Sequence, residues 1–171
     1  MENQATRVIF FGASAVSEQA AIFCKLLGFE VVVLDDEPVK FQVPGFADCT
    51  CTQVDFEDET SLDAIGITSD DMVCIITRGH THDRQAFAYA LKSPAFYKGM
   101  MGSAKKNAKC FAYALEYGCT QEQIDAAYAP IGEEIGAIDA KEIGLSIAAQ
   151  LVKVRNARFP REKDHDSLHA D

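Results

Sequence analysis

Short apolar runs that alternate with longer segments of helical periodicity are the feature that most limits how this chain can fold. The first run, RVIFFG, is almost continuously apolar, as expected of a strand buried on both faces of a sheet. The runs predict five strands, at residues 7–12, 29–36, 49–54, 71–77 and 95–103, with helical patterns between most of them. Repeated β-α units of this kind predict an α/β fold. We expect one doubly wound, mainly parallel, Rossmann-like sheet of strand order about 3-2-1-4-5, with helices on both faces.

Capping residues and glycines predict where several helices begin and end. The helix after residues 95–103 is expected to end at Gly118. Its apolar positions are Phe111, Ala112 and Leu115. A Thr-x-x-Gln capping box begins a short helix at Thr120, and a variant of that box begins the last helix at Asp139. Gly144 lies inside this last helix, where glycine is unfavourable, and therefore predicts close packing against another element.

The length and charge of the chain limit its possible domain organisation and binding partners. The 171 residues suit one domain, predicted at residues 1–157, and the aperiodic tail at residues 158–171 is expected to be flexible. The net charge of −10 argues against nucleic acid and anionic membranes as partners, because both bind basic surfaces. The polar, acidic start does not resemble a signal peptide, and no apolar run approaches the roughly 18 residues of a membrane helix. We therefore expect a cytoplasmic protein.

The six cysteines do not indicate a metal centre. Cys24, Cys74 and Cys110 fall within apolar helix or strand patterns, where cysteine packs as a small hydrophobic residue. Cys49 and Cys51 form the one close pair, and no histidine or second pair lies nearby in sequence to complete a tetrahedral site. We expect reduced thiols and no bound metal.

The ligand of a doubly wound sheet binds at the carboxyl ends of the strands, where the strand order reverses. The first loop there begins at Gly12, which can make the tight turn of a dinucleotide-binding loop. Ser14 and Ser17 stand where the dinucleotide fingerprint has its second and third glycines. The loop is therefore a degraded dinucleotide site but a plausible anion site at a helix start, and a plain strand-to-helix turn is an equal alternative.

Two further loops carry charged and polar residues. Asp35 ends the second strand at the position where an acidic residue commonly binds a ribose hydroxyl, although solvated charge is an equal alternative. The next loop, TRGHTHDR, supplies Thr77, His80 and Asp83, either as ligand contacts or, for Asp83 and Thr81, as helix caps. His80 and Asp83 lack a third protein ligand for a metal.

A fourth loop gives the strongest residue-level indication of a phosphate-bearing ligand. Gly102 and Ser103 begin a helix, and Lys105 and Lys106 fall in its first turn. Cations at this end of the helix dipole are unfavourable by roughly 0.3–1 kcal/mol each, so the helix start is expected to hold an anion. The alternative is that both lysines extend into solvent. Gly132 belongs to an ordered loop further along the chain and is a further candidate contact, with a purely structural role as the alternative.

Several stretches together resemble the carboxy-terminal Rossmann-like domain of the XdhC/CoxI family. They run in order from about residue 7 to residue 155. The stretches are FGASAV, LGFEVVVLDDEP, ITRGHTHDRQAF, SPAFYKGMMGSAKKNA and APIGEEIGAIDAKEIGLSIAAQLVKVR. The chain departs from the family's usual pattern at Ser14, Ala15 and Glu37, where glycine, histidine and arginine are common, and longer members carry an additional amino-terminal domain.

The resemblance implies a non-catalytic accessory protein that binds the molybdenum cofactor and passes it to a molybdenum hydroxylase such as xanthine dehydrogenase. Its implied partners are the apo-hydroxylase, a cysteine desulfurase, a separate subunit of the amino-terminal type and a second copy of the chain. The first contact residues expected for the cofactor are Ser14, His80, Asp83, Ser103 and Lys105. Two alternatives stay open: an oxidoreductase that binds NAD through Gly12 and Asp35, and a Rossmann domain that serves only to dock a partner.

Overall fold

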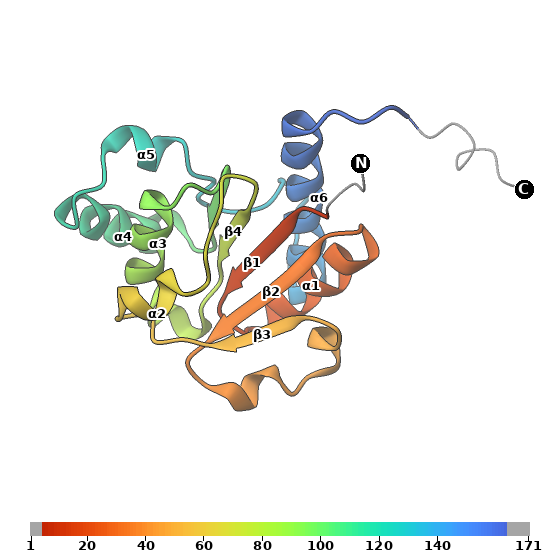
Figure 1. Cartoon of the computed structure of the whole chain (residues 1–171). Helices are drawn as coiled ribbons and strands as arrows, with labels where there is room; N and C mark the ends of the chain where they lie inside the picture. Colours follow the sequence, from red (N-terminus) through yellow and green to blue (C-terminus); the bar gives the residue numbers. More distant parts are fainter. Residues whose placement is uncertain (1–4, 164–171) are drawn as a thin grey trace, which may run out of the picture.

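The computed structural model describes residues 5–163 and contains one five-stranded parallel sheet (Figure 1). The strands are β1 (Arg7–Phe11), β2 (Glu30–Asp35), β3 (Thr50–Gln53), β4 (Met72–Ile75) and β5 (Tyr97–Met100). Their order is β3-β2-β1-β4-β5, which confirms the predicted topology. Strand β1 lies at the centre and pairs in parallel with both β2 and β4, so the strand order reverses between β1 and β4.

Helices cover both faces of the sheet, as predicted. The helices are α1 (Ala15–Leu26), α2 (Glu59–Asp63), α3 (Asp83–Lys92), α4 (Ala104–Glu116), α5 (Gln121–Asp125) and α6 (Ala140–Arg158). Three short 3-10 turns complete the set: η1 (Pro38–Phe41), η2 (Pro44–Phe46) and η3 (Arg78–His80). Helices α1 and α6 pack on one face, and α2 to α5 lie on the other (Figure 1).

The continuous apolar character of the strands follows from this three-layer arrangement. In β1, Ile9 and Phe11 enter the core beneath α3 and α4, whereas Val8 and Phe10 enter the core beneath α1 and α6. All four side chains are fully buried. Since neighbouring side chains of a strand point to opposite faces, a strand covered on both faces needs apolar residues at every position.

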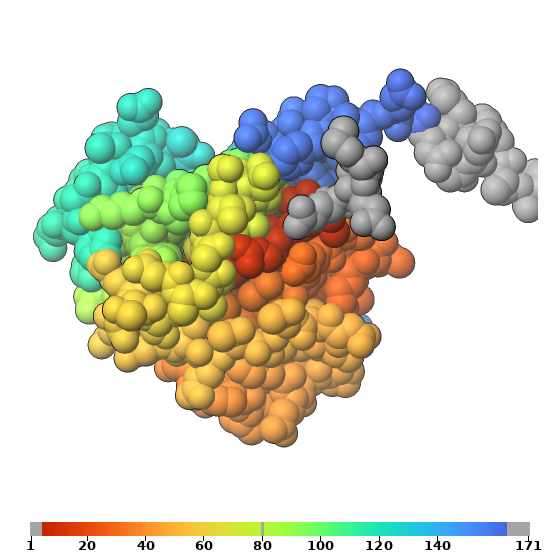
Figure 2. All heavy atoms as spheres, in the orientation of Figure 1, coloured from red at the N-terminus to blue at the C-terminus, as the bar shows by residue number. Residues whose placement is uncertain are grey.

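Close packing at Gly144 joins the two helices of one face. A Cβ atom at this position would lie 2.8 Å from the backbone nitrogen of Ala20 in α1. Glycine therefore lets α6 approach the backbone of α1, which confirms the prediction of close packing. The far end of α6 and the start of β1 lie on the same side of the molecule (Figure 2).

Helix α4 is rotated relative to the expectation from its apolar pattern. Its buried residues are Asn107, Cys110 and Ala114, while Leu115 is exposed. Strand β5 also ends at Met100, earlier than predicted. The sequence pattern placed Ala112 and Leu115 on the apolar face, but both are exposed, and Asn107 is buried instead, where its Nδ2 donates to the carbonyl of Gly102 at 3.2 Å.

The ends of the predicted domain are described only in part. Helix α6 continues to Arg158, one residue into the predicted tail, and residues 164–171 lie outside the described residues. The domain limits and the flexibility of the tail therefore stay predictions. Within residues 5–163, no helix combines the length and apolar character needed to cross a bilayer.

The cysteines predicted to pack as small apolar residues do so. Cys24 and Cys74 are fully buried and Cys110 is nearly so. Burial raises the pKa of the Cys24 thiol to about 12 and that of Cys110 to about 11, which keeps both protonated at neutral pH. All six cysteines are free thiols.

Candidate functional site

The loops that carry the predicted site residues meet at the carboxyl edge of the sheet. Pairing in register aligns Phe11 with Leu34 and with Ile75, and Ile75 with Met100, so the strands end at one level. The loops that follow β1, β2, β4 and β5 therefore come together around the reversal of strand order. This edge is where a doubly wound sheet binds its ligand.

Gly12 makes the turn out of β1 at a position that no other residue fits. Its φ angle is 115°, and a Cβ atom would lie 2.4 Å from the carbonyl oxygen of Ile76. Its N–H donates to the carbonyl of Leu34 at 2.7 Å. The turn thus packs closely against the ends of β2 and β4, as the tight turn of a nucleotide-binding loop would.

Ser14 and Ser17 close the first loop on itself. Ser14 Oγ accepts the N–H of Ser17 at 3.1 Å, and Ser17 Oγ accepts the N–H of Ser14 at 2.7 Å. Ser17 is fully buried and its hydroxyl donates to the carbonyl of Gly12 at 2.7 Å. Across the described chain, the N–H groups of Ala15 and Val16 have no partner, so they remain available to an anion at the start of α1.

Asp35 is buried and is held by donors from three residues. Its Oδ2 accepts the N–H of Ala13 at 2.7 Å, and its Oδ1 accepts the N–H of Glu37 at 3.0 Å and Nη2 of Arg78 at 3.3 Å. Burial opposes ionisation, but these donors together hold the pKa of Asp35 below its ordinary value. The carboxylate predicted to bind a ribose hydroxyl therefore joins β2 to the β1 turn and to the loop after β4.

Arg78 and His82 take part in the site although neither was among the predicted contact residues. Arg78 Nη2 lies 2.6 Å from Glu37 Oε1, and His82 Nε2 lies 3.2 Å from Asp36 Oδ2. The hydrogen bond to Glu37 is the main reason that the pKa of Arg78 is raised. The signal in the sequence was opposite charge on two loops, but the adjacency of those loops depends on strand order.

Three buried polar atoms near these ion pairs lack a partner in the described part of the chain. They are Arg78 Nε, His82 Nδ1 and Gln85 Oε1. The ring of His82 is stacked against Phe56, with centroids 5.2 Å apart. Buried polar atoms are nearly always hydrogen-bonded, so this corner of the carboxyl edge suits a bound water or ligand group.

Thr77 and Asp83 connect the end of β4 to the start of α3. Thr77 Oγ1 donates to Asp83 Oδ1 at 2.5 Å, and both residues are buried. The side-chain cap of α3 that was the alternative role for Thr81 or Asp83 is not formed, because His82 is the N-cap residue. His80 lies in the η3 turn, and its side chain is outside the described residues.

The start of α4 presents the exposed part of the site. Ser103 is the N-cap residue, and its hydroxyl accepts the N–H of Lys106 at 3.4 Å. Gly102 has a φ angle of 152°, and a Cβ atom there would lie 2.4 Å from Oδ1 of the buried Asn107. Lys105 and Lys106 are exposed, and neither forms an ion pair with a carboxylate among residues 5–163. Two exposed lysines thus belong to the first turn of α4, at the positive end of the helix dipole.

The backbone of Gly132 is bound by a side chain of α6. Its N–H donates to Gln150 Oε1 at 2.9 Å, and its carbonyl accepts from Gln150 Nε2 at 3.1 Å. Tyr97 also donates to Gln150 Oε1, at 2.6 Å. These bonds support the structural alternative, and direct contact of Gly132 with a ligand stays a prediction.

The comparison with protein families shows to which family the chain belongs. A family model described as the XdhC Rossmann domain matches residues 8–151. The chain belongs to the XdhC family. The recognition made from the sequence stretches is confirmed, and so is the Rossmann-like fold.

Three relatives place this XdhC-family chain among longer proteins. It is 28% identical over 150 residues to the Escherichia coli (strain K12) protein named uncharacterized protein YqeB, covering 88% of this chain and 27% of that one. It is 24% identical over 149 residues to a Bacillus subtilis (strain 168) protein named as a probable xanthine dehydrogenase subunit, covering 87% of this chain and 43% of that one. A crystal structure described as a xanthine dehydrogenase from Bacillus halodurans superposes with a TM-score of 0.77 at 27% identity, covering 96% of this chain and 46% of that one. This chain thus spans less than half the length of each relative.

Proposed function

We propose that this XdhC-family domain is a non-catalytic accessory protein that holds a phosphate-bearing cofactor, the molybdenum cofactor, and assists its delivery to a molybdenum hydroxylase of the xanthine dehydrogenase type. Membership of the family supports an accessory role, and the names of two relatives support a xanthine dehydrogenase as the client. The observation that carries the proposal is the start of α4, where Lys105 and Lys106 lie exposed and without a carboxylate partner in the described chain.

A bound phosphate explains this arrangement in energetic terms. Each lysine in the first turn opposes the helix dipole at a cost of about 0.3–1 kcal/mol, and an anion at the helix start reverses that cost. Ser103 has its hydroxyl at the same place, and the N–H groups of Ala104 and Lys105 have no acceptor in residues 5–163. Phosphate binding at helix starts uses this set of donors.

The start of α1 and the start of α4 together form the proposed cofactor site, which we call the cofactor cradle. The free N–H groups of Ala15 and Val16 lie at the same edge of the sheet, next to the partly exposed Ser14. We expect Ser103, Lys105 and Lys106 to hold the phosphate and Ser14 with Ala15 to contact the remainder of the cofactor. When bound, the cofactor supplies the redox-active molybdenum centre that the client enzyme uses. The loops that carry these contact residues are held in place at the ends of the strands by Gly12, Asp35, Thr77 and Asp83.

The NAD-dependent oxidoreductase is less compatible with the geometry. A ribose hydroxyl would have to reach an Asp35 carboxylate that already accepts three hydrogen bonds and belongs to a residue only 2% exposed. A pyrophosphate would also compete for the N–H of Ala13, which Asp35 occupies. A dinucleotide in this place would therefore compete with the hydrogen bond between Ala13 and Asp35.

The partners of the domain follow from the same proposal. The apo-hydroxylase receives the cofactor, and a cysteine desulfurase supplies its terminal sulfur. A separate subunit of the amino-terminal type fits the observation that the relatives are more than twice as long as the matched part. A homodimer and a cytoplasmic location complete the proposal.

A titration of the protein with isolated molybdenum cofactor tests the proposal. We expect saturable binding, which Lys105→Glu weakens at least tenfold. Lys109→Glu is the matched control, because Lys109 is an exposed lysine of the same helix beyond its first turn. Lack of saturation at micromolar protein rejects the proposal, as does an equal loss of affinity in both variants.

A further inference from the structure

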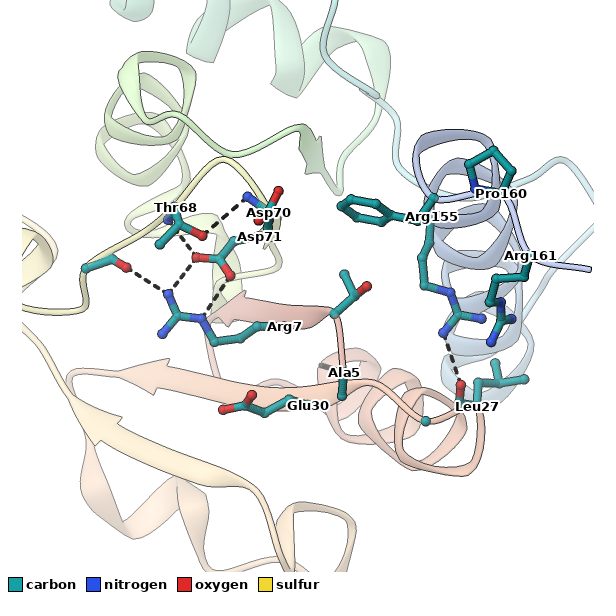
Figure 3. A pocket seen from close by; sticks show the side chains of 14 residues that line it. Ala5, Arg7, Leu27, Glu30, Thr68, Asp70, Asp71, Arg155, Pro160 and Arg161 are labelled. Carbon is teal, nitrogen blue, oxygen red and sulfur yellow. Dashed lines mark hydrogen bonds and ion pairs between the residues drawn. The ribbon is translucent and has the colours of Figure 1, made fainter. Parts of the chain in front are cut away.

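A hollow lies at the opposite edge of the sheet from the candidate site, where the strands begin. It has a volume of about 780 Å³. It opens between the start of β1, the start of β2, the loop before β4 and the end of α6 (Figure 3). The sheet separates this hollow from the carboxyl edge, so none of the predicted site residues lines it. We call it the amino-edge hollow.

The two sides of the amino-edge hollow differ in charge. On one side, Arg7 is paired with Asp71, with Nη2 and Oδ2 2.5 Å apart, and the carboxylates of Glu30 and Asp70 lie nearby (Figure 3). On the other side, Arg155 and Arg161 lie next to each other (Figure 3). The acidic side is balanced in part by Arg7, whereas the basic side has no comparable balance.

Arg155 is a buried cation whose partners are all neutral. Its side chain belongs to a residue only 7% exposed, and Nη1 donates to the carbonyl of Leu27 at 3.1 Å. Its guanidinium lies 4.1 Å from the centroid of the Phe29 ring, and Nε donates to Asn156 Oδ1 at 3.3 Å. The carbonyl end of α1 and the face of the ring favour one positive charge at this place.

Arg161 brings a second positive charge to the same acceptor. Its Nη2 donates to Asn156 Oδ1 at 3.3 Å, the oxygen that Arg155 already contacts. Among residues 5–163, no carboxylate pairs with either arginine. Burial and the charge of Arg161 both lower the pKa of Arg155. Two guanidinium groups that line the hollow thus converge on one neutral oxygen, which leaves a local excess of positive charge there.

An oxyanion is the group that satisfies this arrangement. Guanidinium groups offer planar pairs of N–H donors that match the geometry of carboxylate and phosphate oxygens. The volume of the hollow falls within the range of about 300–1,000 Å³ typical of small-molecule sites. On the far side, Glu30 and Asp70 offer acceptors for hydroxyl or amine groups of the same molecule.

We propose that the amino-edge hollow is a second ligand site, in which Arg155 and Arg161 hold the carboxylate or phosphate group of a small molecule. The site is independent of the cofactor cradle at the carboxyl edge and stands whether or not that cradle binds molybdenum cofactor. Its ligand is an anion that also carries hydrogen-bond donors.

Calorimetric titration with inorganic phosphate and, separately, with citrate tests this site. Both titrations use a Lys105→Gln/Lys106→Gln background, so that phosphate binding at the start of α4 does not contribute. We expect saturable binding of at least one anion with a dissociation constant of about 1 mM or below. The anion that binds shows whether the site takes phosphate or carboxylate groups.

Arg161→Gln is the decisive variant, because Arg161 is exposed and its loss leaves the core intact. It should weaken binding at least tenfold with an unchanged thermal midpoint. Arg158→Gln is the control, since Arg158 is exposed at the end of α6, carries the same charge and does not line the hollow. Lack of saturation with both anions, or equal loss in the two variants, overturns the proposal.

Discussion

The Asp35 carboxylate accepts the N–H of Ala13 at 2.7 Å and thereby ties the end of β2 to the turn out of β1. In a dinucleotide-binding fold, the same loop turns its amide groups toward a pyrophosphate. Here one of those amides is used within the protein, and the paired serines Ser14 and Ser17 use two more. The first loop is thus built for rigidity, and its free amides are confined to the first turn of α1.

Asp35→Asn should destabilise the fold. The amide would bring an NH₂ group toward the donors of Ala13, Glu37 or Arg78, so at least one buried hydrogen bond is lost together with the charge. We expect a loss of about 2 kcal/mol in the free energy of unfolding, measured by urea denaturation. Asp36→Asn, at a carboxylate 41% exposed, should cost less than about 1 kcal/mol. Equal costs in the two variants would contradict this account.

Acid should destabilise the protein through Asp35 and Asp71. Although burial opposes ionisation, the Arg7 guanidinium and the Thr68 N–H hold the pKa of Asp71 below its ordinary value, and Asp35 is lowered as well. Because the pKa is lower in the folded state, the stabilisation is present above the unfolded pKa of about 4 and is lost as the pH falls through the folded pKa.

This pH dependence is measured by urea unfolding at a series of pH values. The urea concentration at the midpoint of unfolding should decrease as the pH is lowered below about 5. Asp71→Asn removes one of the responsible groups and should give a lower midpoint at neutral pH with a shallower fall in acid. An acid response identical to that of the unaltered protein would show that Asp71 plays no part.

Gly12→Ala should be far more damaging than Gly28→Ala. Both glycines have positive φ angles, but a Cβ atom at Gly12 would lie 2.4 Å from the carbonyl oxygen of Ile76, whereas at Gly28 it would meet nothing within 4 Å. Gly28→Ala therefore carries only the backbone strain of about 1–2 kcal/mol. Gly12→Ala adds displacement of the β4 end, and we expect it to exceed the control by at least about 2 kcal/mol in thermal or urea unfolding. A difference close to zero would mean that the turn can move away from β4.

The serine pair should behave as one unit. Ser17→Ala leaves the N–H of Ser14 and the carbonyl of Gly12 without the hydroxyl, at a cost of about 1–2 kcal/mol. Ser14→Ala removes the N-cap of α1, at a cost of about 1 kcal/mol. In a double-mutant cycle the two losses should differ from additivity by at least about 0.5 kcal/mol. Strict additivity would show that the two side chains act separately.

Sequence periodicity was sufficient for the architecture. The apolar runs identified the five strands, and their alternation with helical segments predicted a doubly wound sheet, whose strand order the structure confirms. Gly144 marked the close approach of α6 to α1. These features are local or depend on burial on both faces of the sheet, and both leave a periodic trace in the sequence. The buried face of α4 was the exception, since it includes the polar Asn107, whose side chain is bound to the Gly102 carbonyl in the turn before the helix.

Only the tertiary structure determined which polar side chains are exposed to a ligand and which are bonded within the protein. Asp35, Thr77 and Lys105 were all candidate contacts in the sequence, yet the first two are buried and bonded within the protein and the third is exposed. The convergence of Arg155 and Arg161 beside Leu27 also left no pattern in the sequence. Periodicity reports which face of an element is buried, whereas hydrogen-bond partners depend on which distant strands and helices become neighbours, and that is settled only when the sheet assembles.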